Sequence, residues 1–340
     1  MISFKKRFKS HHLLSHEALL RRLKPKYRHN ENLQANYHSY RAGYLGEKSV
    51  DYKLSLFPKK DFFHLPSLRL QNNFHFFQID SLVLTPKLIF QLESKNIKGT
   101  LQYNGMHKQL IQIDGDKKTS YKDPILQAEI QKRHLMQWLQ KYGVKIPIET
   151  IVVSANPNSL IQNPHNDPTF NDRFISLENL IFRMDEIYHS YHEHLLTLSQ
   201  LKNLYHLLVQ HDMPLSSDPI KYYNLKKHHF IQGVACERCF YSPLKRGRGY
   251  WTCPKCAEKN LLGHERVILD YFLIHRPFIT NNICRELLQI ASPDTSYYIL
   301  NSMGLEKTGG NKNRKYLAPN LDQFPQDAEP KLFELSILDR

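Results

Sequence analysis

The sequence predicts an α/β protein in which a domain of strands and helices precedes a helical segment, a cysteine ribbon and a winged-helix-like region. Two apolar runs, Phe76–Leu84 and Leu88–Ser94, indicate the sheet, because a short turn at Thr85-Pro86-Lys87 joins them as paired strands. A flanking helix is indicated between Arg41 and Phe57, where apolar residues recur at helical spacing. Two Cys-x-x-Cys pairs indicate the ribbon.

The remaining elements follow in chain order. Further strands are expected near Phe62–Leu68 and Ile148–Ser154, and a second helix from about Pro124 to Tyr142, where proline suits the first helical turn. The predicted organisation is a basic N-terminal segment (1–38), a sheet-and-helix domain (39–165), a helical connector (166–228), a cysteine ribbon (229–261), a winged-helix-like domain (262–320) and a tail (321–340).

The N-terminal segment is rich in positive charge. Nine lysine and arginine residues lie between Lys5 and Arg28, against Glu17 and Glu31. Two interpretations remain open for this segment, namely a nucleic-acid-binding arm and a solvated helical leader.

Three charged residues interrupt the apolar hairpin. If Pro86 and Lys87 form a two-residue loop, Asp80 lies directly opposite Glu93, at a Cβ separation of about 5 Å. Two like charges repel at this range unless a cation lies between them, and Mg²⁺ or Mn²⁺ accepts carboxylate oxygens readily. Lys95 shares a face with Glu93 because side chains alternate along a strand. The hairpin therefore predicts a metal site with an ammonium that can orient water or stabilise phosphate charge.

A further carboxylate lies upstream of the hairpin. Glu47 falls inside the apolar stripe of the helix between Arg41 and Phe57. It can edge this stripe and reach solvent, or it can point inward. Because Asp80 and Glu93 lie downstream, we expect it to point inward.

Overall charge limits the choice of partner. The chain of 340 residues carries a formal net charge of +15, which favours a polyanion, with nucleic acid first and an anionic membrane surface second. No apolar run is long enough to span a bilayer, and the start of the chain lacks the pattern of a signal peptide. We therefore expect a cytoplasmic protein.

The cysteines predict a second metal site. Thirteen residues separate the pair Cys236 and Cys239 from the pair Cys253 and Cys256, a spacing typical of a closed, structural four-cysteine Zn²⁺ site. Disulfides are the alternative, and a cytoplasmic setting argues against them. The intervening basic loop ends in Tyr250-Trp251, which can contact nucleic acid or pack around the ribbon. The fifth cysteine, Cys284, is expected to be a small apolar residue of a helix.

The connector and the C-terminal region carry weaker signals. The connector is expected to be mostly helical, including Met184–Gln210, and its histidines are interpreted as surface residues rather than metal ligands. In the C-terminal region, three helical segments precede two strands around a basic turn near Gly309. This order predicts a winged helix, with a helical packing module as the alternative.

Residues 39–160 resemble the NERD (nuclease-related) domain of the PD-(D/E)XK nuclease superfamily. The resemblance rests on Gly43-x-x-Gly46-Glu47, Gln78-Ile79-Asp80, Glu93-Ser94-Lys95-Asn96 with Gly99, and Asp123-Pro124-x-x-Gln127. It implies a restriction-endonuclease-like mixed sheet and a magnesium-dependent phosphodiesterase site. In that site Asp80 and Glu93 bind metal, Lys95 positions water, Glu47 supports the metal site and Gln127 lines it. Ile79 replaces the proline of the superfamily name, and Asp123 replaces a frequent asparagine.

The resulting hypothesis is a magnesium-dependent nuclease that hydrolyses the phosphodiester bonds of DNA, rather than RNA, in DNA repair or in defence against foreign DNA. The alternative is a catalytically inactive protein with a nuclease fold that acts as a DNA-binding or regulatory protein. A weaker alternative is an adaptor that uses its basic face on membranes or partners.

Overall fold

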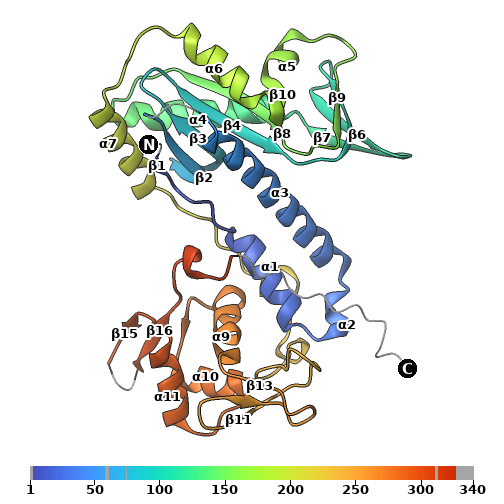
Figure 1. Cartoon of the computed structure of the whole chain (residues 1–340), viewed down its shortest axis with the longest axis vertical. Coiled ribbons are helices and arrows are strands. Elements are labelled where there is room, and N and C mark those ends of the chain that lie inside the picture. The colour runs from blue at the N-terminus through green and yellow to red at the C-terminus, as the bar shows by residue number, and fades with distance from the viewer. Residues whose placement is uncertain (1–2, 58–60, 74, 311–312, 327–340) are drawn as a thin grey trace. The chain divides into compact units, whose positions relative to one another are not determined.

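The computed structural model describes residues 3–57, 61–73, 75–310 and 313–326. Most of the predicted tail and two residues of the predicted wing, Asn311 and Lys312, lie outside these ranges. The chain forms two compact units: unit 1 comprises residues 1–7 and 41–214, and unit 2 comprises residues 8–40 and 215–340. One long helix, α3 (Glu31–Ser55), contributes residues to both units (Figure 1).

A six-stranded mixed sheet forms the centre of unit 1. Its strands, in spatial order, are β1 (Ser3–Phe4), β2 (Phe63–Asn72), β3 (His75–Leu84), β4 (Ile89–Lys95), β8 (Ile148–Ser154) and β10 (Phe174–Ser176). β2, β3 and β4 are antiparallel neighbours, whereas β4, β8 and β10 run parallel. The mixed sheet flanked by helices confirms the predicted fold class.

The register of the β3–β4 hairpin agrees with the prediction. Ser81 pairs with Leu92, and Leu84 pairs with Ile89. The amide of Thr85 donates to the carbonyl of Leu88, which closes the two-residue loop. One further step of the same register places Asp80 opposite Glu93.

Helices cover both faces of this sheet. On one face, α4 (Pro124–Lys141) and α7 (Leu198–Gln210) bury Leu135, Trp138 and Leu204 against the strands. On the other, α3 and α6 (Leu180–Ser190) bury Val50 and Met184. The connector is thus helical, but α6 and α7 are separate helices, so the expected continuous stretch 184–210 is interrupted between residues 190 and 198.

A second sheet of unit 1 has no counterpart in the sequence prediction. It contains β7 (Lys117–Lys122), β6 (Gln109–Asp114), β5 (Gly99–Asn104) and β9 (Ser159–Gln162), and it projects beyond the main sheet (Figure 1). A short helix, α5 (Pro168–Arg173), packs Phe170 against Tyr103 of this sheet, with ring centroids 4.3 Å apart.

Unit 2 begins with α1 (His11–Arg22) and α2 (Pro25–Arg28). Most of α1 is buried, including Leu13, Leu19 and Arg22. The interpretation of the N-terminal segment as a solvated helical leader is therefore wrong for α1, because this helix lies in the core of unit 2. A short helix, α8 (Pro219–Tyr222), follows the boundary at residue 214.

The end of unit 2 has the element order of a winged helix. It runs α9 (Gly263–Ile274), β14 (Phe278–Ile279), α10 (Asn281–Leu288), α11 (Pro293–Ser302), β15 (Lys307–Thr308) and β16 (Lys315–Leu317). The three strands form one sheet in the order β14-β16-β15. The predicted helices and the two wing strands are present, and β14 is an additional strand. Cys284 is buried in α10, as expected.

Candidate functional site

Asp80 and Glu93 project from facing positions of β3 and β4. Glu93 is only 3% exposed, and its Oε1 accepts hydrogen bonds from Lys95 Nζ and Gln127 Nε2, both at 2.8 Å. Its second oxygen, Oε2, is buried without a hydrogen-bond partner in the described residues. Asp80 Oδ2 accepts from the Ser94 amide at 2.9 Å, which ties it to the neighbouring strand. The pair therefore offers a buried, unsatisfied carboxylate oxygen to a cation.

Lys95 and Gln127 complete this side of the site. Lys95 Nζ also donates to Gln127 Oε1 at 3.1 Å, so the two side chains and Glu93 form a closed triangle of hydrogen bonds. The first turn of α4 positions Gln127, because Asp123 caps that helix by accepting from the Ile125 amide at 2.8 Å. Both oxygen acceptors of Asp123 are used, since Tyr103 donates to the other at 3.0 Å. Asp123 therefore makes both contacts at this position without the asparagine that is frequent in the family.

Glu47 points inward, as expected, from the middle of α3. Its side chain is 21% exposed and pairs with the guanidinium of Arg7. The preceding residue, Gly46, allows the helix to approach the end of β4, because a Cβ there would lie 2.5 Å from the side chain of Asn96. Asn96 fixes this contact by donating to the carbonyl of Ala42 at 2.7 Å.

Arg7 was missed by the sequence analysis. Its side chain is 2% exposed, and it binds Asp51 through two nitrogens at 2.7 and 2.8 Å while it also pairs with Glu47. It further donates to the Ser67 and Ser81 hydroxyls, both at 2.7 Å, and to the carbonyl of Asp80 at 2.9 Å. Arg7, which follows β1 in the chain, therefore connects α3 to the backbone of Asp80, a candidate metal ligand.

The backbone around Asp80 departs from regular sheet geometry. Ser67, which the register places beside Asp80, has a φ of +51°, and this position is left out of the β2–β3 ladder. Left-handed serine costs roughly 1–3 kcal/mol and persists only where surrounding contacts hold it. Here Arg7 supplies that contact, because its guanidinium donates hydrogen bonds to both the Ser67 hydroxyl and the Asp80 carbonyl. The interruption leaves that carbonyl available to the guanidinium.

Burial raises the pKa of all three carboxylates, and the charge of Asp80 adds to this effect at Glu93 and Glu47. Burial, followed by the charge of Asp80, raises the pKa of Glu93 to about 7 against the opposing effect of Lys95. Burial and Asp80 similarly raise the pKa of Glu47 to about 8, with Arg7 acting in the opposite direction. Burial raises the pKa of Asp80, against its hydrogen bond from Ser94. Without a cation the site therefore retains protons near neutral pH, and a bound cation would displace them.

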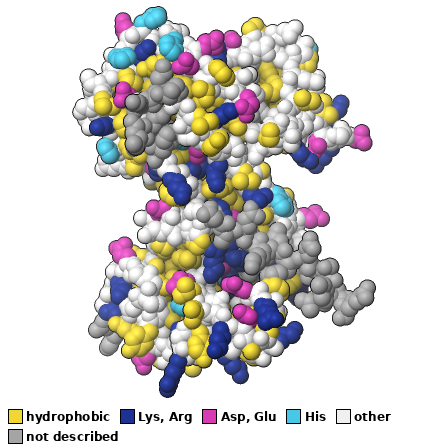
Figure 2. Space-filling model, in the orientation of Figure 1, with side chains coloured by type: hydrophobic (Ala, Val, Ile, Leu, Met, Phe, Trp, Pro, Cys, Tyr) yellow, Lys and Arg dark blue, Asp and Glu magenta, His cyan; other side chains and the backbone are white. Residues whose placement is uncertain are grey.

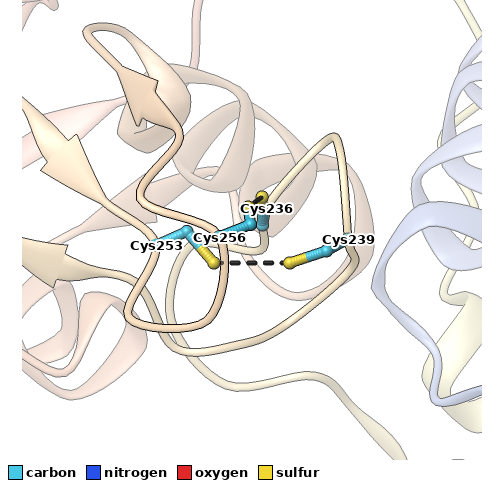
Figure 3. Close-up of side chains that lie close together, drawn as sticks. All are labelled: Cys236, Cys239, Cys253 and Cys256. Atoms are coloured by element: carbon cyan, nitrogen blue, oxygen red, sulfur yellow. Dashed lines mark hydrogen bonds between the residues drawn. The ribbon is translucent and has the colours of Figure 1, made fainter.

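The four cysteines of the ribbon come together in unit 2. Their sulfurs all lie within 4.8 Å of one another, with Cys236 and Cys256 at 3.6 Å and Cys239 and Cys253 at 3.4 Å (Figure 3). These atoms can hold a metal ion. Within the described ranges no other group of three or more His, Cys, Asp or Glu side chains does so, and the connector histidines lie exposed outside such a group.

The two Cys-x-x-Cys segments have the same local geometry. After each second cysteine, Phe240 and Ala257 adopt a φ of about +60°, and their amides donate back to the carbonyls of Cys236 and Cys253. Three short strands form one small sheet here: β11 (Lys245–Arg246) and β12 (Trp251–Thr252) lie between the two segments, and β13 (Lys259–Asn260) follows the second. The repeated turn directs two thiols of each segment to one point.

The two aromatic residues of the basic loop between the Cys-x-x-Cys segments differ in their exposure. Trp251 is 1% exposed, and its Nε1 donates to His264 Nδ1 at 3.1 Å, so it packs inside unit 2. Tyr250 is half-buried beneath Lys259, whose Nζ lies 4.8 Å from the ring centroid. The packing interpretation therefore holds for Trp251, and only Tyr250 presents a partly open ring.

Known proteins were compared with the chain. Residues 42–155 match the family model of the nuclease-related domain, NERD, which is about a third of the chain. No curated protein matches. Among solved structures, protein VC1899 from Vibrio cholerae matches at 13% identity with a TM-score of 0.23, over 48% of this chain and 36% of that one, a likeness too low to bear on fold or function.

The domain match includes four of the residues around Asp80, namely Glu47, Glu93, Lys95 and Gln127. It excludes Arg7 and the whole ribbon. Within the described residues, every helix is too short or too polar to cross a bilayer. The match indicates a nuclease-related function, with nucleic acid as the partner, for residues 42–155.

Proposed function

We propose that unit 1 is a metal-dependent nuclease that hydrolyses phosphodiester bonds of DNA with Mg²⁺ or Mn²⁺ held by Asp80 and Glu93. The observation that carries this proposal is the buried Glu93 Oε2, which has no hydrogen-bond partner in the described residues, on a residue that the hairpin register puts opposite Asp80. A buried carboxylate oxygen without a partner is costly, and a hard divalent cation is the ligand that would compensate both carboxylates at once.

The proposed mechanism assigns a role to each side chain. When bound, the cation lowers the pKa of a water molecule and neutralises charge on the phosphate oxygens. Lys95 would orient the water and stabilise the transition state, a role supported by its Nζ lying 2.8 Å from Glu93 Oε1. Gln127 restrains both side chains. Glu47 and Arg7 hold Asp80 in place through its backbone rather than by touching substrate.

We further propose that the four cysteines bind one structural Zn²⁺. A tetrahedral site with bonds of about 2.3 Å separates sulfurs by about 3.8 Å. The two shorter distances, 3.4 and 3.6 Å, lie near that value. Four thiolates leave no open position, so the ion stabilises the ribbon and takes no part in hydrolysis.

Electrostatic attraction would supply non-specific grip on DNA. The net charge of +15 supports binding to a polyanion whose affinity falls steeply with salt. On the face seen in Figure 2, lysine and arginine side chains lie on both units and are interspersed with acidic ones.

Cleavage assays test the proposal directly. Purified protein is incubated with linear, circular and single-stranded DNA and with RNA, in Mg²⁺, Mn²⁺ or EDTA. Asp80→Ala and Lys95→Ala should lower the cleavage rate by at least a hundredfold, because each removes charge stabilisation of the transition state. Matched controls are Asp116→Ala and Lys117→Ala on the exposed β6–β7 turn, which should cleave at the wild-type rate.

Two results would count against the proposal. Metal-dependent cleavage that survives both Asp80→Ala and Lys95→Ala would remove the site assignment. Absence of cleavage with every substrate and metal would favour a protein that binds nucleic acid without cutting it. Preference for RNA over DNA would retain the site but reverse the substrate.

A further inference from the structure

Unit 2 contains a cavity of about 460 Å³, bordered by α9, α10 and the segment 220–232. Its walls are mostly apolar and include Ile220, Leu225 and Ile283. Phe230 and Tyr271 add aromatic surface, and the ring of His275 stacks on Tyr271 with centroids 5.0 Å apart. The size lies within the range of small-molecule sites in proteins.

One charged side chain in this wall has no counter-ion among the residues that the structure describes. Arg22 is 7% exposed, and its Nη2 donates to the carbonyls of Ile231 and Gly233 at 2.6 and 3.0 Å. Among the described residues no carboxylate forms an ion pair with it. The acid whose charge acts on Arg22, Asp270, already binds Arg21 at 2.7 Å. Burial lowers the pKa of Arg22 to about 10, so it remains charged at neutral pH.

The other charged residues that line the cavity add to the positive charge of Arg22. Lys226, Lys227 and Arg276 line it, against a single acid among the lining residues, Glu286, which is paired with Lys227. Burial and the nearby cations, Arg22 first, lower the pKa of His275 to about 4. The cavity thus combines an apolar interior with an uncompensated positive charge.

We propose that this cavity binds a small organic anion, a carboxylate or phosphate carried on an apolar body, with the anionic group on Arg22. The guanidinium has donors beyond Nη2, and its planar fork matches both kinds of oxyanion. The apolar body would cover Ile283 and its neighbours and leave the rim cations outside. This site is independent of the proposed nuclease chemistry, because every lining residue belongs to unit 2.

Calorimetric titration of the full chain tests the proposal with three probes of equal chain length: octanoate, octyl phosphate and 1-octanol. At least one anion should bind with one-to-one stoichiometry and at least tenfold tighter than octanol, since a hydrogen bond to a charged group supplies that much discrimination. The better anion identifies the head group. Equal binding of octanol and the anions, or no binding of either anion, would overturn the proposal.

Two substitutions locate the site. Arg22→Met should remove the preference for the anion, whereas Arg248→Met, at an exposed arginine of the ribbon, should leave it unchanged. Ile283→Trp fills the cavity and should abolish binding of all three probes. Anion binding that persists in both Arg22→Met and Ile283→Trp, with both variants folded by thermal melting, would place the anion elsewhere and refute the assignment.

Discussion

Replacing Glu93 by glutamine should stabilise the metal-free protein at alkaline pH. The substitution keeps an oxygen that can accept from Lys95 and Gln127, as Glu93 Oε1 does at 2.8 Å. It replaces the buried Oε2, which has no partner in the described part of the chain, with a neutral amide. Substitution of Glu93, a proposed metal ligand, would thus increase the free energy of unfolding of the metal-free protein.

The magnitude follows from the pKa of Glu93, which is raised from an ordinary 4.5 to about 7. Between these values the folded state holds a proton that the unfolded state has lost, so the free energy of unfolding falls as pH rises through this window. At about 1.4 kcal/mol for each pKa unit, the full penalty above pH 7 is roughly 3 kcal/mol. Below pH 4.5 both states are protonated and the penalty is absent.

Urea unfolding in EDTA at pH 4.5 and pH 8 measures this difference. Glu93→Gln should be close to wild type at pH 4.5 and up to about 3 kcal/mol more stable at pH 8. Added Mg²⁺ at pH 8 should stabilise the wild type by mass action and have little effect on the variant. Glu193→Gln, at an exposed carboxylate, should match the wild type at both pH values.

Two outcomes would refute this reasoning. If Glu93→Gln is destabilised equally at both pH values, the carboxylate makes a stabilising contact that outweighs its burial. If the variant gains stability at pH 8 but the wild type gains none from Mg²⁺ or Mn²⁺, burial of the charged Glu93 carboxylate destabilises the folded state, but the carboxylates do not bind a metal ion.

The remaining predictions concern other contacts. Arg7→Met should lower the free energy of unfolding by roughly 2–4 kcal/mol because it leaves two partly buried carboxylates, Glu47 and Asp51, without the guanidinium, whereas Lys6→Met, at an exposed neighbour, should change it little; equal effects in urea unfolding would contradict this. Removal of zinc by a chelator should shift the emission of Trp251 to the red, and a Trp251→Phe variant should lose that shift and retain only the signal of Trp138. Apparent Mg²⁺ affinity should rise with pH by up to tenfold for each unit below about 7, as Glu93 loses its proton, and then level off; a calorimetric profile that stays flat would exclude this coupling.

The β3–β4 hairpin shows how far local sequence information extends. A two-residue loop fixes the register of a hairpin, so the opposition of Asp80 and Glu93 followed from counting residues. The N-terminal boundary of α3 did not follow in this way. The helix begins ten residues before the expected start at Arg41, because Leu33 and Tyr37 are buried in a largely polar stretch.

Other parts of the site depend on contacts that sequence patterns do not express. Arg7 lies 73 residues from Asp80, and nothing in the spacing of charges links the two. The left-handed backbone of Ser67 is equally unforeseeable, since serine is not a residue that requires it. The strand β7, with the sequence Lys-Lys-Thr-Ser-Tyr-Lys, lacks the apolar alternation by which strands are recognised.

The path of the chain limits how this protein can be divided. It crosses from one unit to the other after residues 7, 40 and 214, so neither unit corresponds to a continuous stretch of sequence. A fragment cut at the limits of the nuclease-related match, 42–155, would lose β1 and Arg7 from one end and α6, α7 and β10 from the other. Functional dissection of this protein therefore calls for point substitutions in the full chain, because truncation would remove parts of both cores at once.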